Sequence, residues 1–188
     1  AEWLAEADRL IASWATDKPI LIYRPLVERN EWGGCKARNP DREAYRTLLE
    51  AIRGRFFVVS VADLVDGVEW ISSHEAGADV EYHGGELVFE TLAALVSRAA
   101  LVFAAPGFAV PLAQAVGTPV VAVFGGYESA RSFSLGARFA PYLGIEPVTP
   151  CECFAHDHAC EKRIDVPAAT ERLLRFVHET ADHRPVAA

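Results

Sequence analysis

The strongest constraint on the fold is the run from Leu101 to Gly126, where two uninterrupted apolar segments flank a short helical pattern. Residues 101–105 and 120–124 are typical of strands buried on both faces of a sheet. Gly117 is placed to end the intervening helix, expected over about 108–116, in a left-handed conformation. This spacing predicts a crossover between two parallel, adjacent strands. Their trailing loops would lie at the carboxyl edge of the sheet, where open α/β domains bind ligands.

The composition fits one large domain of this type. The chain has 188 residues, of which 51% are hydrophobic, enough to cover both faces of a sheet. Its formal net charge of -8 disfavours nucleic acid or an anionic membrane as the main partner. No apolar run approaches the ~20 residues of a transmembrane helix, and no signal-peptide pattern opens the chain. Four Cys would allow a secreted domain with disulfides, but a chain of this size does not need them, so we expect a cytoplasmic protein. The absence of Met indicates a piece of a longer chain or a processed product.

Strand and helix patterns alternate along the rest of the sequence. Asn39-Pro40 has the form of a helix start with Asn39 as the cap, and Asp165 is placed to cap the last helix. The alternation predicts a doubly wound parallel α/β sheet, Rossmann-like, of about six strands with flanking helices, in the order 3-2-1-4-5-6. We expect a linker helix within 1–17, a Rossmann-like domain over 18–180 and a frayed tail over 181–188. The strands are expected over 20–23, 56–61, 80–82, 101–105, 120–124 and 146–148, and further helices over about 40–53, 87–98 and 166–177.

Two segments carry a resemblance to a known family. Residues 84–103, which begin Gly84-Gly85-Glu86-Leu87, and residues 111–125, which end Val-Ala-Val-Phe-Gly, resemble the C-terminal domain of the heptosyltransferase-like glycosyltransferases of family 9. Cys160-Glu-Lys-Arg-Ile-Asp-Val is similar to the segment that precedes the family's last helix. The order of elements is similar over roughly residues 19–177.

The resemblance implies a GT-B arrangement, in which two Rossmann-like domains face each other across a cleft. It implies that this chain is the C-terminal half, which holds a nucleotide-diphosphate sugar. An N-terminal acceptor domain outside this chain would supply the catalytic base, so no catalytic residue is assigned here. The family carries Asp-Ser-Gly or Asp-Thr-Gly and then His after the fourth strand. In this sequence those slots read Pro106-Gly107-Phe108 and Pro111.

Donor-binding residues are expected in the loops at the carboxyl edge. Arg38 matches a family position, just before a helix-opening Pro, whose basic residue contacts donor phosphate, and Lys36 is its neighbour. A guanidinium suits phosphate because it can donate to two oxygens at once. The alternative for both basic residues is an ordinary solvated loop charge. At the start of the next helix, the backbone amides of Gly107, Phe108 and Ala109 are expected to hold a diphosphate without side chains.

The loop after the fifth strand is a second candidate. Gly125 and Gly126 would let a ligand approach the backbone closely. Tyr127 suits stacking on a base or a sugar, and Glu128 suits hydrogen bonds to hydroxyl groups. The alternative is an ordinary tight turn that leaves the sheet.

Cysteine and histidine residues cluster between residues 151 and 160, and one further cysteine lies in the loop after the first strand. We expect the two loops to meet and to bind a zinc ion or an iron–sulfur cluster, although the spacing is not that of a regular zinc finger. The alternatives are reduced cysteines or one disulfide. The candidate ligands are Cys35, Cys151, Cys153 and Cys160, with His156 and His158 as alternates.

Three functions remain open at this point. The first is the donor-binding half of a GT-B glycosyltransferase that moves a sugar from a nucleotide-diphosphate sugar to a saccharide acceptor. The second is a catalytically decayed GT-B-like binding or scaffolding module with a Cys-rich metal or partner site. The third and weaker one is half of a nucleotide-sugar epimerase. The sequence has no P-loop, no Gly-x-Gly-x-x-Gly after the first strand and no evident Ser-His-Asp arrangement, which disfavours nucleotide triphosphatases, dehydrogenases and hydrolases.

The metal site generates a direct prediction. Protein purified without a metal-affinity step is expected to carry about one zinc ion or one iron–sulfur cluster per chain, because thiolates at this density favour soft metals. Elemental analysis measures this. Protein free of both zinc and iron would exclude the site.

Overall fold

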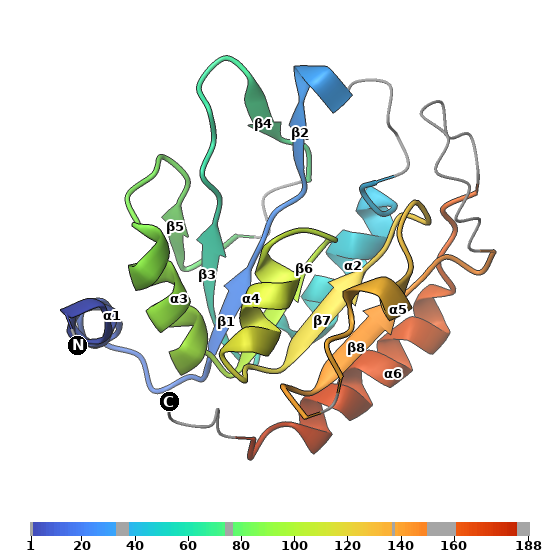
Figure 1. Cartoon of the computed structure of the whole chain (residues 1–188). Coiled ribbons are helices and arrows are strands. Elements are labelled where there is room, and N and C mark those ends of the chain that lie inside the picture. Colours follow the sequence, from blue (N-terminus) through green and yellow to red (C-terminus); the bar gives the residue numbers. More distant parts are fainter. Residues whose placement is uncertain (1, 33–37, 74–76, 137, 150–160, 184–188) are drawn as a thin grey trace.

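A six-stranded parallel sheet forms the centre of the protein (Figure 1). The computed structural model describes residues 2–32, 38–73, 77–136, 138–149 and 161–183. The strand order β5-β3-β1-β6-β7-β8 confirms the predicted doubly wound sheet and its 3-2-1-4-5-6 order. The strands of this sheet are β1 (Ile20–Tyr23), β3 (Phe57–Val61), β5 (Val80–Tyr82), β6 (Leu101–Ala104), β7 (Val120–Val123) and β8 (Tyr142–Ile145).

Helices cover both faces of the sheet (Figure 1). One face packs against α2 and α6, and the other against α3 and α4, while α1 packs on the outer side of α3. No helix in the described ranges combines the length and the apolar character that a bilayer crossing requires. The helices are α1 (Glu2–Ser13), α2 (Arg42–Arg53), α3 (Phe89–Arg98), α4 (Ala109–Ala115), α5 (Ala130–Phe133) and α6 (Val166–Glu179), with a 3-10 turn η1 (Asn30–Trp32).

Strand β1 lies at the middle of the core, between β3 and β6. All four of its side chains are buried, which is why it reads as an unbroken apolar run rather than an alternating one. Leu21 and Tyr23 face the layer of α2 and α6, and Ile20 and Ile22 face the layer of α3 and α4. The strand therefore ends at a fixed point on the carboxyl edge of the sheet.

Some features of the fold differ from the sequence predictions. A second, two-stranded antiparallel sheet of β2 (Val27–Arg29) and β4 (Glu69–Ile71) stands above the carboxyl edge, in segments where no strand was predicted (Figure 1). The predicted strand over 146–148 is wrong, because the edge strand is β8. Glu146 lies beyond it and accepts a hydrogen bond from the amide of Ala130 at 2.7 Å.

The predicted cap of α2 is also wrong. Asp41, rather than Asn39, caps the helix, with Oδ1 accepting a hydrogen bond from the amide of Ala44 at 2.8 Å. The side chain of Asn39 instead donates to the carbonyl of Val27 at 3.1 Å and so ties the chain before α2 to β2. The predicted cap of the last helix is confirmed, because Asp165 Oδ1 accepts a hydrogen bond from Ala168 at 3.1 Å.

A substitution at Gly117 tests how the chain crosses from β6 to β7. Its φ of +82° confirms the predicted left-handed conformation after α4. Gly117→Ala should lower the free energy of unfolding by about 1–2 kcal/mol, because a Cβ is disfavoured in that conformation. Gly54→Ala is the control, since Gly54 has a φ of -58° and open space around a Cβ, and it should be neutral or stabilising. Chemical denaturation measures both, and equal effects of the two substitutions would contradict the account.

Candidate functional site

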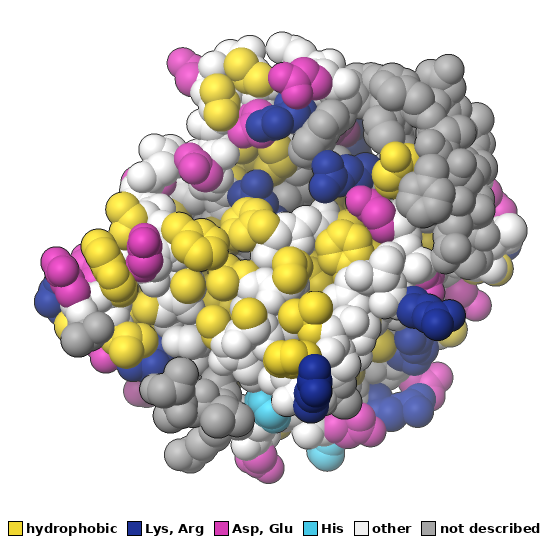
Figure 2. Space-filling view, in the orientation of Figure 1, with side chains coloured by type: hydrophobic (Ala, Val, Ile, Leu, Met, Phe, Trp, Pro, Cys, Tyr) yellow, Lys and Arg dark blue, Asp and Glu magenta, His cyan; other side chains and the backbone are white. Residues whose placement is uncertain are grey.

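The carboxyl edge of the sheet carries a hollow of about 170 Å³ between the ends of β1 and β6. We call it the larger hollow, because a smaller cavity adjoins it. It brings together the chain after β1, the segment before α2 and the start of α4. Figure 2 shows basic side chains gathered in the recess beneath the β2–β4 sheet. The larger hollow is lined by Arg24, Pro25, Val27, Arg38, Asn39, Ala105, Pro106, Gly107, Phe108 and Ala109.

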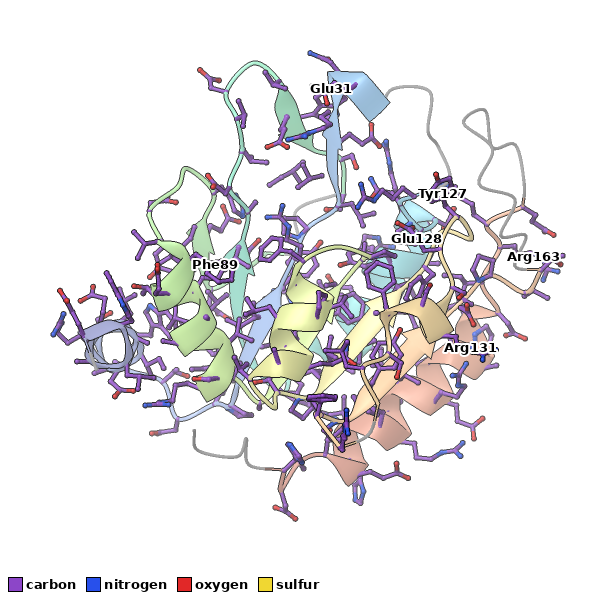
Figure 3. All side chains as sticks on the ribbon, viewed as in Figure 1. Glu31, Phe89, Tyr127, Glu128, Arg131 and Arg163 are labelled. Carbon is purple, nitrogen blue, oxygen red and sulfur yellow. The ribbon has the colours of Figure 1, made fainter. Side chains whose placement is uncertain are left out.

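Arg38 lies in this hollow, as the sequence led us to expect of a residue at the carboxyl edge. Its Nε lies 3.5 Å from Oε1 of Glu128, which comes from the loop after β7. Figure 3 shows Tyr127 and Glu128 on that loop, close to the segment that precedes α2. Two candidate segments far apart in sequence therefore converge at one place.

Glu128 is a partly buried carboxylate whose two oxygens lie in different surroundings. Its side chain is 17% exposed, and Oε2 is fully buried without a hydrogen-bond partner among the described residues. Burial raises the pKa of this carboxyl group, and the charge of Arg38 opposes that rise. An unmet acceptor in a buried position is costly, so Oε2 lowers the stability of the fold at this point.

Arg24 is a site residue that the sequence reasoning missed. It follows β1 directly, lines the larger hollow, and donates from Nη1 to the carbonyl of Val61 at 3.0 Å. Its guanidinium carbon lies 5.4 Å from the centre of the Phe108 ring, within cation–π range. The sequence offered one indication of its role, because Arg24 is a basic residue immediately after a strand predicted to be central.

The segment Gly107–Ala109 lines the larger hollow. Among the described residues, none accepts a hydrogen bond from the amides of Gly107, Phe108 or Ala109. A Cβ placed on Gly107 would meet nothing nearer than the carbonyl of Ala105 at 4.0 Å, so a ligand can approach this backbone. The Phe108 side chain is 46% exposed and borders the hollow rather than filling it completely.

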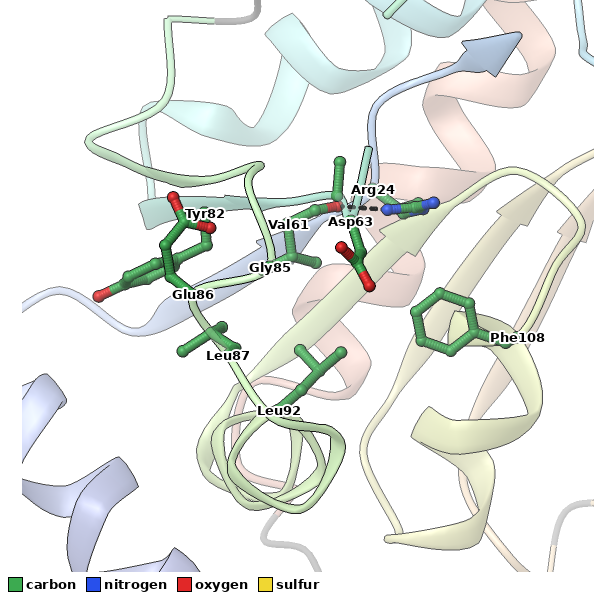
Figure 4. A pocket seen from close by; sticks show the side chains of 10 residues that line it. Arg24, Val61, Asp63, Tyr82, Gly85, Glu86, Leu87, Leu92 and Phe108 are labelled. Carbon is green, nitrogen blue, oxygen red and sulfur yellow. Dashed lines mark hydrogen bonds between the residues drawn. The ribbon is translucent and has the colours of Figure 1, made fainter. Parts of the chain in front are cut away.

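A smaller cavity of about 40 Å³ adjoins the larger hollow on the side of β3 and β5 (Figure 4). Arg24 and Phe108 line both spaces and lie between them. The opposite wall in Figure 4 is formed by Tyr82, Glu86 and Leu87. Its lining is mostly apolar, with carboxylates of Asp63 and Glu86 at the margin, and its full set is Arg24, Val61, Ala62, Asp63, Tyr82, Gly85, Glu86, Leu87, Leu92 and Phe108.

The other predicted residues after β7 occupy different surroundings. Gly125 and Gly126 are buried, and Gly126 has a φ of +99°, which accounts for a glycine at that position. Neither they nor Tyr127 line the larger hollow. Of this loop, Glu128 makes the described connection to the hollow, through Arg38.

Several predicted residues lie outside the described residues. These are Lys36 and all candidate metal ligands: Cys35, Cys151, Cys153, Cys160, His156 and His158. The metal site therefore stays a prediction. The described residues beside these segments do meet, since Lys162 Nζ donates to the carbonyl of Asn39 at 2.5 Å.

A serine–histidine contact that the sequence did not reveal lies elsewhere on the sheet. Ser60 Oγ is 2.8 Å from Nε2 of His83, and Glu81 Oε2 is 3.8 Å from Nδ1 of the same ring. Ser60 is 2% exposed and lines neither the larger hollow nor the smaller cavity. A hydroxyl buried in this way cannot reach a substrate, so the contact belongs to the core and does not indicate a hydrolase.

The fold and the position of the hollow define the class of protein: an open α/β domain whose ligand edge is basic and partly apolar. Comparison with solved structures shows a heptosyltransferase-like fold. E. coli ADP-heptose LPS heptosyltransferase II superposes with a TM-score of 0.60 at 16% identity over 96% of this chain. A family 9 glycosyl transferase from Veillonella parvula superposes with a TM-score of 0.53 at 16% identity over 77% of it.

The chain spans about half of those proteins, covering 52% of the E. coli enzyme and 40% of the Veillonella protein. No protein-family profile matches the sequence, and no curated protein matches it significantly. At 16% identity, the similarity to these structures shows a similar fold and no more. The larger hollow and the smaller cavity are both small beside the about 300–1,000 Å³ of pockets that enclose a ligand.

Glu128 gives a prediction for the pH dependence of stability. Because its folded-state pKa is raised, the ionised form is the one that destabilises the fold, and this cost is present above the folded pKa. Glu128→Gln should therefore raise the free energy of unfolding at pH 8. The gain should disappear below about pH 4, where the carboxyl is protonated in both states.

Denaturation at a series of pH values measures this effect. Glu50→Gln is the matched control, since Glu50 forms an exposed pair with Arg53 on α2. A Glu128→Gln protein that is less stable at pH 8 would mean that the pair with Arg38 outweighs burial.

Proposed function

We propose that this chain is the donor-binding half of a GT-B glycosyltransferase, which transfers a sugar from a nucleotide-diphosphate sugar to a saccharide acceptor. The observation that carries the proposal is the convergence of two guanidinium groups, Arg24 and Arg38, with the open backbone at Gly107 on one hollow. That hollow lies at the carboxyl edge, where open α/β sheets bind ligands. The heptosyltransferase-like fold supports the same reading.

The chemistry of sugar transfer requires this kind of site. As the bond between the sugar and the diphosphate breaks, negative charge develops on the leaving diphosphate. Fixed cations and backbone amides aimed at that charge lower the barrier, because they need no reorganisation during the reaction. In this proposal Arg38 and the amides of Gly107–Ala109 do this work, and the acceptor and its base come from a second domain.

Glu128 extends the proposal to the sugar. Its carboxylate is partly exposed, has Oε1 3.5 Å from Nε of Arg38, and suits a ligand hydroxyl. The donor would then lie with its diphosphate near the arginines and a hydroxyl-bearing group near the loop after β7. An intracellular, cytoplasmic location is proposed with this function, because nucleotide sugars are expected there.

A second candidate function is a binding module that no longer transfers sugar. The observation that favours it is Pro106-Gly107-Phe108 with Pro111, where the family resemblance implies Asp, a hydroxyl residue and His. The exposed Phe108 ring at the hollow could exclude a sugar and favour a different ligand.

Calorimetric titration with ADP, GDP and UDP, and with their sugars, separates the two functions. A donor-binding half is expected to bind at least one nucleoside diphosphate and its sugar. Arg38→Ala should then weaken binding by about 1–3 kcal/mol, the range for a hydrogen bond to a charged group.

Arg46→Ala serves as the control for this substitution, because Arg46 pairs with Glu43 on the exposed side of α2. Indifference of the wild-type protein to all of these ligands would rule out the donor-binding function and leave the binding module.

A further inference from the structure

Arg24 has a backbone position that leaves it little freedom. Its amide donates to the carbonyl of Phe103 at 2.9 Å, which continues the pairing of β1 with β6 by one residue. Its carbonyl accepts a hydrogen bond from the hydroxyl of Tyr45 at 2.7 Å, and Tyr45 is fully buried under α2. The base of the Arg24 side chain is therefore fixed by the core of the domain rather than by a loop.

The guanidinium of Arg24 makes two contacts with the described residues, one with a carbonyl and one with an aromatic ring. Val61 carbonyl is the hydrogen-bond acceptor that the described residues offer to its guanidinium, and the guanidinium carbon lies over the Phe108 ring at 5.4 Å from its centre. A guanidinium has five N–H donors in a planar fork. Most of these donors remain for a partner, and they border both the larger hollow and the smaller cavity (Figure 4).

The charge of Arg24 lacks a counter-ion within the described part of the chain. Burial lowers the pKa of the guanidinium, and the charges of Tyr45, Glu69 and Asp63 act against that change. Neither carboxylate forms an ion pair with Arg24, and Glu69 is paired with Arg29. Arg38 differs in this respect, because an anion must compete with Glu128 for it.

We propose that Arg24 binds a phosphate group of the ligand directly, and that Phe108 holds the guanidinium in position for this contact. The identity of that group as part of a nucleoside diphosphate rests on the proposed function. The contact itself requires an anion with at least two oxygens in one plane, since the Arg24 fork then donates two parallel hydrogen bonds. Arg24 thereby supplies positive charge at a site where the charge of Arg38 is partly neutralised by Glu128.

The test uses Arg24→Met, which keeps an unbranched side chain but shortens it and removes the charge, with inorganic pyrophosphate as the probe. Calorimetry should show that affinity for pyrophosphate falls at least about tenfold, because a charge-assisted contact is lost. The melting temperature of the ligand-free variant should stay equal or rise, since a partly buried charge without a counter-ion is removed. Arg46→Met is the control and should change neither quantity.

A loss of affinity smaller than tenfold in Arg24→Met would overturn the proposal. If that variant does not fold, Arg24→Lys decides, because an ammonium keeps the charge but not the fork. Direct binding predicts at least about threefold weaker affinity for pyrophosphate in Arg24→Lys, and an unchanged affinity contradicts it.

The same measurements distinguish this proposal from the proposed function. Wild-type protein that binds pyrophosphate in an Arg24-dependent way, but no nucleoside diphosphate, supports the Arg24 contact and overturns the donor-binding function. Wild-type protein that binds a nucleoside diphosphate equally well after Arg24→Met supports the function and overturns the contact. Binding of neither probe overturns both.

Discussion

The pairing of β1 with β3 on one side and β6 on the other is the constraint on which the rest of the structure depends. Four buried side chains in β1 join the two halves of the core, because alternate residues face opposite helical layers. The register of the same pairing fixes where β1 ends relative to β3 and β6. Every candidate residue of the carboxyl edge is positioned relative to that end, and Arg24 directly follows it.

The electrostatics of this edge follow from how each arginine is compensated. Arg38 shares its charge with Glu128, whereas Arg24 is stabilised by a carbonyl and an aromatic ring. A ring and a carbonyl orient a guanidinium without neutralising it, so its field remains available to an anion. In the proposed site, an anion would compete with Glu128 for Arg38, whereas Arg24 has no ion-pair partner among the described residues. The fold that carries this site is similar to that of heptosyltransferase II.

The parts of the fold that could be predicted are those that depend on local burial. Unbroken apolar runs gave the positions of β1, β6 and β7, and their spacing gave the order of the sheet. The β2–β4 sheet could not be predicted, because its strands are short, only partly buried and paired across forty residues, as between Arg29 and Glu69. Arg38 was found through a resemblance, while Arg24 needed the register of β1 and the place of Phe108, neither of which is visible in sequence.

The measurement that tests the central claim most directly is an NMR titration of the isotope-labelled chain with a nucleoside diphosphate. The account predicts that the Arg24 side-chain Nε–H and the amides of Gly107 and Phe108 shift together in one saturable transition. Shifts confined to other parts of the molecule, or an unmoved Arg24 Nε–H at saturation, would contradict a diphosphate site at the carboxyl edge.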